Sequence, residues 1–458
     1  MIAHSARIYP GDGNEAVAFL ACGRRDGERK LRLTVQDVFY VPHDACTVRT
    51  PDQVTWPTDA IAPLLDRAAA LGLTLIKVHS HPGGYSRFSA LDDAADAKLF
   101  PLVHGWVEAD VPHGSAIMLP CGRMFGRIYD SDDTVRPIEL ISVAGDDLHF
   151  WFADEAGDSV PAFVASHAQA FDVGTIRRLQ RLTAGAVGAS GTGSPTVEQL
   201  ARLGAGEIVS VDDDRMEARN VNRVINSTME DVRQARFKVD VLADAVERMG
   251  LGTKVRRFTR SLWDLEVVRA IAECDVLFGC MDTVDGRFLL NTIATYYNIP
   301  YFDIGVRLDA VPDGPRKGKI REVCGTINYI QPGRSSLMSR GLFTMQEIAA
   351  AGLRRKDPAA HARQVKDGYI KGVQGHRPAV ISVNMLGSSL AANEFLARLH
   401  PFREEPNGDF AAVTFSLSSM EIITDPESDP CPILKKCVGR GDVEPLVGLM
   451  DFARRSAA

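Results

Sequence analysis

Residues 182–212, LTAGAVGASGTGSPTVEQLARLGAGEIVSVD, decide the fold of the larger part of this chain. The stretch opens with an apolar run, passes through a loop rich in glycine and serine, and continues through a helical segment into a second apolar run. A strand, a helix and a second strand in this order form a parallel βαβ unit. We therefore expect a parallel sheet whose first strand ends at the glycine-rich loop.

The alternation of strands and helices continues on the carboxyl side of this stretch. A long helix is predicted around residues 232–250, and further strands are predicted at 254–259, 274–280 and 299–306. Residues 334–377 are polar, with helical pieces and no strand pattern, and are predicted to be an insertion. An apolar helix at 379–399 and strands at 411–417 and 420–424 close the domain, which spans 166–425, and 426–458 is predicted to be a tail.

The first part of the chain has a different pattern. Apolar runs within residues 14–41 are separated by the charged turn RRDGERK, which indicates antiparallel strands. A helix is expected within 57–73, followed by a buried strand at 73–82. Further short strands are predicted at 102–110, 115–120, 123–130, 137–144 and 148–154. Residues 1–155 are therefore expected to form an α+β domain.

Composition excludes several classes of protein. Hydrophobic residues make up 45% and charged residues 24% of the 458, which is typical of a folded globular protein. The net charge of −7 argues against a basic surface for nucleic acid or an anionic membrane. The sequence shows no signal peptide or bilayer-spanning run, and its eight cysteines are sparse, so we expect a cytoplasmic protein with reduced thiols.

The string HSHPGGYSRFSALDD, residues 79–93, predicts a metal site. Residues two apart in a strand face the same side, so His79 and His81 can present two imidazoles to one zinc ion. Asp92 can supply a third ligand and leave the fourth position to water. Hydrolysis also requires a base and a donor to the oxyanion, for which Glu15 and Ser89 are available.

This pattern, with an acidic residue upstream, resembles the JAB/MPN (JAMM) metallopeptidases, which have a cytidine-deaminase-like fold. The resemblance implies that His79, His81 and Asp92 bind zinc, that Glu15 is the general base, and that Ser89 stabilises the oxyanion. It also implies cleavage after the C-terminal glycine of ubiquitin or a ubiquitin-like protein. The alternative is that the two histidines are only hydrogen-bonded polar groups and that Glu15 is an exposed strand residue.

The glycine-rich loop predicts a nucleotide site. Gly188, Gly191 and Gly193 lie between a strand and a helix, where backbone N–H groups can approach phosphates. Asp212, about 20 residues on, is suited to bind a ribose hydroxyl. At this level NAD and ATP cannot be distinguished.

Residues further along favour ATP. Asp214, Asn220, Arg223 and Lys238 follow the second strand, and Asp282 follows the strand at 274–280. Hydride transfer does not require the two cations, whereas adenylylation of a carboxylate uses them to stabilise charge on the triphosphate while an Asp holds Mg²⁺.

Residues 166–425 resemble the ThiF/MoeB family and the adenylation domains of ubiquitin-activating enzymes, through GxSGxG, D-x-D, N-x-x-R, Lys238 and CMDTVDGR. The resemblance assigns Asp212 to the ribose, Asn220, Arg223 and Lys238 to the phosphates, and Asp282 to Mg²⁺. Three departures are seen, one of which is the absence of the two C-x-x-C pairs that bind a structural zinc in many relatives. Ser190 replaces a usual glycine, and no cysteine lies between Arg334 and Pro378, where some relatives carry a thioester cysteine. Either the reaction stops at the acyl-adenylate or another thiol serves, with Cys324, Cys431 and Cys437 as candidates.

Together the two domains predict a bifunctional enzyme of a bacterial-type ubiquitin-like system. One domain would remove or trim the ubiquitin-like protein with zinc, and the other would adenylylate its C-terminus with ATP and Mg²⁺. The resemblance also implies a homodimer through the second domain and leaves open a conjugating enzyme as a further partner. Three alternatives stay open: activation of a sulfur-carrier protein for thiamin, molybdopterin or cysteine synthesis, a catalytically silent binding module, and a nicotinamide oxidoreductase.

Overall fold

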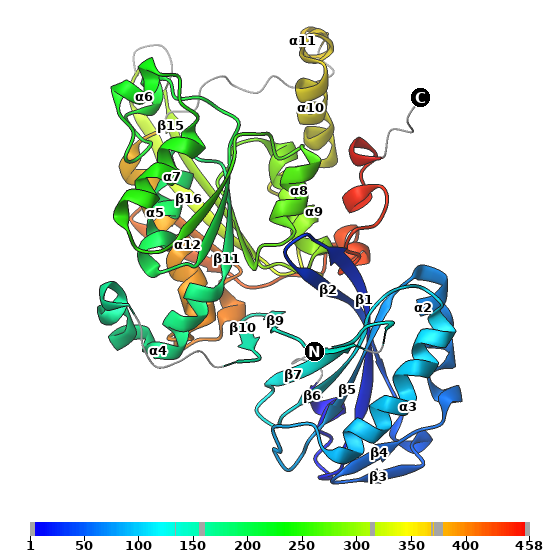
Figure 1. Ribbon diagram of the computed structural model, residues 1–458. Coiled ribbons are helices and arrows are strands. Elements are labelled where there is room, and N and C mark those ends of the chain that lie inside the picture. The colour runs from blue at the N-terminus through cyan, green and yellow to red at the C-terminus, as the bar shows by residue number, and fades with distance from the viewer. Residues whose placement is uncertain are drawn as a thin grey trace. The chain divides into compact units, whose positions relative to one another are not determined.

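The computed structural model describes residues 5–132, 134–154, 161–311, 317–367, 370 and 379–453. The chain divides into two compact units. The first contains residues 1–143, 149–157 and 437–458, and the second contains 144–148 and 158–436 (Figure 1). Both units combine helices with a sheet, which confirms the predicted α/β class. The predicted boundaries at 155 and 377 lie outside the described residues.

The first unit is built on a six-stranded mixed sheet. Its strand order is β2 (Leu31–Tyr40), β1 (Val17–Asp26), β5 (Thr74–Ser80), β6 (His113–Met118), β7 (Met124–Tyr129) and β8 (Val135–Pro137). Among the described strands of this sheet, β5 and β6 pair in parallel and the other neighbours are antiparallel. Two small two-stranded sheets complete the described strands that begin in this part of the chain. One is the antiparallel pair of β3 (Val48–Thr50) and β4 (Gln53–Thr55), and the other joins β9 (Leu140–Ala144) and β10 (Leu148–Phe152).

Helices α2 (Ala62–Leu71) and α3 (Ala90–Val107) pack together on one face of this sheet, and α1 (Ser5–Ile8) precedes the strands. The strand predicted at residues 102–110 is wrong, because this segment is the last part of α3 and the turn after it. Phe100, Val103 and Val107 are buried at helical spacing. Their packing in the core outweighs the β-forming character of the local sequence.

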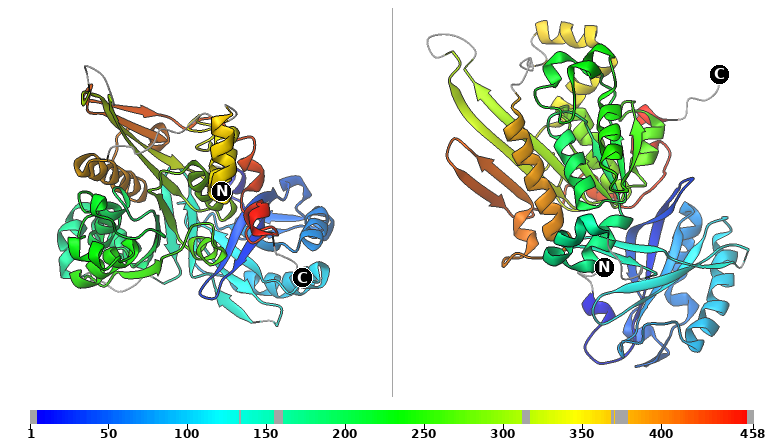
Figure 2. Two further views of the ribbon diagram at one scale, coloured as in Figure 1. Left: turned by 90° about the horizontal axis from the view of Figure 1, so that it is seen from above. Right: turned by 60° about the vertical axis from the view of Figure 1, so that its left-hand side comes forward.

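The second unit contains an eight-stranded sheet that changes from parallel to antiparallel pairing. Its order is β13 (Lys254–Phe258), β12 (Glu207–Val211), β11 (Thr183–Val187), β14 (Val276–Gly279), β15 (Tyr301–Ala310), β16 (Ile320–Ile330), β17 (Ala412–Ser416) and β18 (Glu421–Asp425). The first five are parallel, and the remaining pairings are antiparallel. β15 and β16 are about twice as long as the parallel strands and project beyond them (Figure 2).

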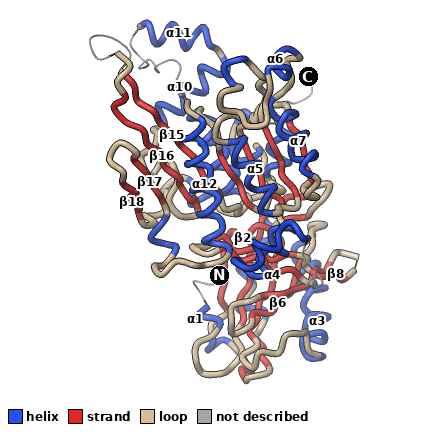
Figure 3. Tube along the Cα trace, turned by 90° about the vertical axis from the view of Figure 1, so that its left-hand side faces the viewer, coloured by secondary structure: helices blue, strands red, loops and turns tan. Residues whose placement is uncertain are grey.

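Helices cover both faces of the parallel part of this sheet. One layer contains α5 (Gly193–Leu203), α7 (Lys238–Met249) and α12 (Ile381–Leu399), which lie in front of the strands in Figure 3. The opposite face carries α8 (Leu265–Ile271) and α9 (Val284–Tyr296) (Figure 1). Helix α4 (Ala165–Arg181) precedes the sheet. The segment before α12 contains α10 (Met345–Lys356) and α11 (Pro358–Lys366).

The single long helix predicted around residues 232–250 is wrong. The structure has two helices, α6 (Met229–Arg233) and α7, separated by a turn in which Ala235 has a φ of 47°. Phe237 pairs with Arg215 in an isolated bridge, and the Lys238 N–H donates to the Asp214 carbonyl at 3.0 Å. These contacts fix the chain before α7, so Lys238 becomes the first residue of that helix.

The tail predicted at 426–458 is divided between the two units. Residues up to Lys436 belong to the second unit, and the segment from Cys437 belongs to the first. Gly439 and Gly441 lie against the backbone of β1 and β2, and the Gly439 carbonyl accepts a hydrogen bond from Thr34 at 2.7 Å. Among the described residues, no helix combines the length and hydrophobicity needed to cross a bilayer.

Candidate metal and nucleotide sites

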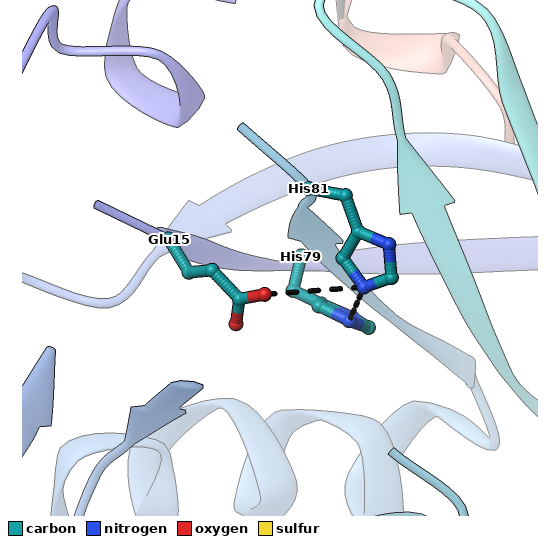
Figure 4. A group of neighbouring side chains, drawn as sticks. All are labelled: Glu15, His79 and His81. Atoms are coloured by element: carbon teal, nitrogen blue, oxygen red, sulfur yellow. Dashed lines mark hydrogen bonds and ion pairs between the residues drawn. The ribbon is translucent and has the colours of Figure 1, made fainter. Parts of the chain in front are cut away.

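His79 and His81 come together at the end of β5 (Figure 4). Their Nε2 atoms are 3.1 Å apart, and both side chains are buried. The Nδ1 atom of His81 donates to the carbonyl of Tyr85 at 2.7 Å, because a carbonyl can only accept. This hydrogen bond fixes the proton on Nδ1 and leaves a lone pair on Nε2, as a metal ligand requires.

Asp92 reaches the same point from the first turn of α3. Its Oδ1 is 2.8 Å from His79 Nε2, and its Oδ2 is 3.5 Å from His81 Nε2. Although burial opposes ionisation, the neighbouring imidazoles of His79 and His81 and the Ser89 N–H hold the pKa of Asp92 below its usual range. Ser89 is the N-cap of α3, and its hydroxyl oxygen accepts from the Asp92 N–H at 3.1 Å. The Ser89 N–H in turn donates to Asp92 at 2.7 Å, so this capping box orients the carboxylate.

Glu15, two residues before β1, completes the group. One carboxylate oxygen lies 3.9 Å from His81 Nε2, and the ligand atoms of Glu15, His79 and His81 all lie within 4.8 Å of one another (Figure 4). Burial raises the pKa of Glu15 to about 7. The structure therefore brings the residues predicted for a base and for a metal into one buried cluster.

The donor set of this cluster suits zinc. Two nitrogens of a tetrahedral site, each about 2.1 Å from the ion, lie about 3.4 Å apart, which is close to the 3.1 Å between the two Nε2 atoms. Burial lowers the pKa of His79, which favours the neutral ring that a metal binds. Burial also acts on His81, but Asp92 and the Tyr85 carbonyl outweigh it and raise the pKa of this second ring. Lone pairs of two imidazoles and a carboxylate converge here. Because the cluster is buried, a bound cation would stabilise this arrangement.

A buried ionic network that sequence analysis missed lies beside these ligands. Lys77 pairs with Asp96, and both side chains are almost fully buried. Arg127 on β7 donates to Asp96 at 2.7 Å and to Asp93 at 2.6 Å. Lys77 is two residues before His79 in β5, and Asp96 is one helical turn after Asp92 in α3. This periodicity is the signal that would have identified the pair from the sequence.

The glycine-rich loop joins β11 to α5 in the second unit, as predicted. Gly188 has a φ of 97°, and a Cβ there would lie 2.7 Å from the Cys280 carbonyl oxygen. A Cβ on Gly193 would lie 1.7 Å from the Gly188 carbonyl oxygen. The loop is thus folded so tightly that side chains cannot be placed at these two positions without moving the backbone.

Asp212, at the end of β12, holds this loop in place. Its carboxylate accepts hydrogen bonds from the Ala189 N–H at 2.6 Å and the Asp214 N–H at 2.9 Å. Burial raises the pKa of Asp212. The ammonium group of Lys238 lies 2.5 Å from Asp214 and 3.9 Å from Asp212. The buried lysine therefore stands beside the loop with two carboxylates as neighbours.

The remaining predicted residues lie at the same edge of the sheet or near it. Asn220 is buried, and its side-chain oxygen accepts from the Glu217 N–H at 3.0 Å. The guanidinium of Arg223 donates to the Arg219 carbonyl at 2.5 Å and makes no ion pair within the described part of the chain. Asp282 is exposed in the loop between β14 and α9.

Acidic side chains group elsewhere at this edge. Carboxylate oxygens of Asp212, Asp213 and Asp214 lie within 4.8 Å of one another, and Asp282 is not in this group. Since β12, β11 and β14 are parallel neighbours, the loops after them end at one edge of the sheet. Asp282 is therefore near the glycine-rich loop by topology.

Two of the three candidate thiols, Cys324 and Cys431, are poorly suited to nucleophilic attack. Burial raises the pKa of Cys324 on β16, which disfavours the thiolate. Cys431 is fully buried, and its sulfur accepts from the Leu434 N–H at 3.5 Å. Cys437 is half-buried.

The fold and these two clusters define a class of protein: a JAB-like α+β unit with a candidate metal centre, joined to a Rossmann-like unit with a phosphate-type loop. The sequence-family model for prokaryotic homologs of the JAB domain matches residues 1–119. The model for the ThiF family matches residues 164–431, more than half of the chain. The chain belongs to the ThiF family.

Several known proteins are similar to parts of this chain. The SAMP-activating enzyme E1 of Haloferax volcanii is 32% identical over 135 residues, which are 28% of this chain and 49% of that protein. Ubiquitin-like modifier-activating enzyme 5 of Bombyx mori is 22% identical over 213 residues, which are 44% of this chain and 50% of that protein. The chain thus spans about half the length of each. The crystal structure of E. coli MccB with succinimide is 16% identical, with a TM-score of 0.44 over 61% of this chain and 75% of that one.

Proposed function

We propose that the second unit activates a ubiquitin-like or sulfur-carrier protein by adenylylating its C-terminal carboxylate with ATP and Mg²⁺. The observation that carries this proposal is the β11–α5 loop with Asp212 and the buried Lys238 beside it. Such a loop offers backbone N–H groups to phosphates. The ammonium of Lys238 is already buried, so little water has to be removed from it when a phosphate binds. The names of the two activating enzymes similar to this chain agree with this chemistry.

The reaction proceeds as a displacement at phosphorus. The carboxylate oxygen of the carrier protein attacks the α-phosphorus of ATP, the bond from this phosphorus to the bridging oxygen breaks, and pyrophosphate leaves with the electron pair. Asp212 holds the ribose, and Asn220, Arg223 and Lys238 contact the phosphates. Asp282 and the neighbouring acidic groups are available to bind Mg²⁺, whose charge offsets that of the triphosphate.

We further propose that the first unit hydrolyses the peptide or isopeptide bond after the C-terminal glycine of the same protein. His79, His81 and Asp92 would hold a zinc ion, which when bound lowers the pKa of water and polarises a carbonyl. Glu15 takes the proton of the attacking water and passes it to the leaving amine. The hydroxyl of Ser89, held at the start of α3, donates to the oxyanion.

The two activities require separate assays on the purified chain. ATP–pyrophosphate exchange with candidate carrier proteins ending in glycine tests the second unit, and zinc content with cleavage of a carrier fusion tests the first. Exchange with a ubiquitin-like protein and not with sulfur carriers supports a role in a ubiquitin-like system. Exchange with sulfur carriers alone supports a role in sulfur transfer. No exchange and no bound zinc would leave only a silent binding role.

Three further features belong to this proposal. The chain acts in the cytoplasm, it forms a homodimer through the ThiF-like unit, and a conjugating enzyme receives the activated protein if a thioester forms. Light scattering of the purified chain tests the dimer. A mass shift of the chain after incubation with ATP and carrier, lost on addition of thiol, tests the thioester.

A further inference from the structure

The side chain of Asn384, in the first turn of α12, lies directly against the glycine-rich loop. Asn384 is 3% exposed, and its Nδ2 lies 2.3 Å from the position that a Cβ on Gly191 would occupy. The Cδ of Arg223 lies 3.5 Å from the same position. Asn384 and Arg223 therefore meet over Gly191, although they come from segments far apart in the sequence.

The amide of Asn384 has no hydrogen-bond partner among the described residues, in contrast to its neighbours. Ser388, one turn later on the same helix face, donates to the Thr192 carbonyl at 2.7 Å and fastens α12 to the loop. The Nδ2 of Asn384 lies against Gly191, within a side chain that is 3% exposed as a whole. Its N–H groups are therefore available at the loop to a ligand that accepts a hydrogen bond.

The loop around Asn384 presents donors of the same kind. Within the described part of the chain, the backbone N–H groups of Ser190, Gly191 and Thr192 make no hydrogen bond to another backbone carbonyl. They precede α5, an eleven-residue helix whose N-terminus carries partial positive charge. The amide of Asn384 thus adds a side-chain donor to a group of unpaired backbone donors.

We propose that Asn384 is a further nucleotide-contacting residue, whose amide donates a hydrogen bond to a phosphate oxygen of ATP bound at the β11–α5 loop. This inference rests on the proposed adenylylation function. A neutral donor strengthens phosphate binding without adding charge beside Arg223 and Lys238. The contact is made from α12, outside the segment in which the other phosphate contacts are predicted.

Titration calorimetry of the full chain with a non-hydrolysable ATP analogue, and separately with adenosine, tests this contact. Asn384→Ala removes the donor and is expected to weaken the ATP analogue about 10-fold to 100-fold, the range for a hydrogen bond to a charged group. Adenosine, which lacks phosphates, is expected to bind as it does to the unaltered chain. Asn384→Asp keeps the shape of the side chain and places a negative charge near the phosphates, so a larger loss is expected.

Asn393→Ala is the matched control, because Asn393 is exposed on the same helix and its amide donates to the Ser389 carbonyl at 2.8 Å. Thermal unfolding without nucleotide shows whether each variant is folded. If the unaltered chain, Asn384→Ala and Asn384→Asp all bind the ATP analogue equally well, the role of Asn384 is overturned and the nucleotide site is not. An equal loss of adenosine and ATP-analogue affinity also overturns it, since that result indicates a distorted loop. Failure of the unaltered chain to bind the analogue overturns the nucleotide proposal as well.

Discussion

The residues of the two candidate sites suit ligands of opposite charge. In the first unit, Nε2 atoms and carboxylate oxygens converge, so the cluster of His79, His81 and Asp92 gathers electron pairs and suits a cation. In the second unit, the backbone N–H groups of a tight loop and the ammonium of Lys238 are donors that suit phosphates, although Asp212 and Asp214 lie beside the lysine. Substitutions at single positions should therefore separate the two chemistries.

Reciprocal loss of activity is expected from His81→Ala and Asp282→Ala. The first removes a zinc ligand and should abolish peptidase activity and most bound zinc while ATP–pyrophosphate exchange continues. The second removes a Mg²⁺ ligand and should reduce exchange at least 100-fold while peptidase activity continues. Both assays and zinc content by atomic emission are measured on each variant. Loss of both activities in either variant contradicts two separate sites.

Lys238 is expected to act on the reacting phosphates. Lys238→Ala should lower the rate of ATP–pyrophosphate exchange by about 100-fold, because it removes a preorganised charge from a buried position. Lys254→Ala, at the exposed start of β13, is the matched control and should leave the rate unchanged. An exchange rate for Lys238→Ala within twofold of the unaltered chain would show that the lysine only pairs with Asp214.

At the scale of elements, β5 and α3 are held against each other by two contacts in succession. His79 faces Asp92, and Lys77 faces Asp96 one step further along both elements. Arg127 on β7 adds a third element to the second contact. The network therefore supports the register in which Asp92 reaches the two histidines.

Breaking this network should destabilise the first unit. Asp96→Ala leaves the buried ammonium of Lys77 without its counter-ion, so the free energy of unfolding should fall by about 3–5 kcal/mol. Asp37→Ala removes the exposed ion pair with Arg67 and should cost less than about 1 kcal/mol. Urea unfolding followed by tryptophan fluorescence gives both values. Equal values for the two variants would mean that the buried pair contributes nothing beyond a surface contact.

Some features of these elements could be predicted from the sequence and others could not. The βαβ order, the glycine-rich loop and the grouping of His79, His81 and Asp92 were predictable, since each depends on spacing within one segment. The helix at 102–107 was not, because its β-forming residues are overruled by packing of Val103 and Val107 in the core. Asn384 was missed for a related reason. It lies almost 200 residues from the loop it contacts, and sequence spacing gives no sign of that contact.

At the scale of the whole molecule, the chain does not divide into consecutive domains. The segment after Cys437 belongs to the first unit, where Asp442 pairs with Arg25 at 2.9 Å and its N–H donates to the Arg24 carbonyl at 2.7 Å. A Cβ on Gly439 would lie 2.2 Å from the Val35 carbonyl oxygen. The close approach of backbones makes this segment part of the packing of β1 and β2.

A chain ending at Lys436 should therefore lose stability in the first unit. Its midpoint of thermal unfolding should fall by several degrees, whereas ATP–pyrophosphate exchange by the second unit should persist. Tryptophan fluorescence reports mainly on the first unit, which holds Trp56, Trp106 and Trp151. Gly439→Ala, which crowds the same contact in the full chain, should lower the midpoint in the same direction. An unchanged midpoint in both variants would contradict a structural role for the segment.

The central claim is that this chain activates the C-terminal carboxylate of a small protein ending in glycine. ATP–pyrophosphate exchange by the purified chain, with the same carrier protein bearing either a free or an amidated C-terminus, tests it most directly. We expect exchange that depends on the carrier and is lost when its carboxylate is amidated, because the carboxylate is the attacking group. Exchange that is equal with both forms, or that proceeds without any carrier, would contradict the account.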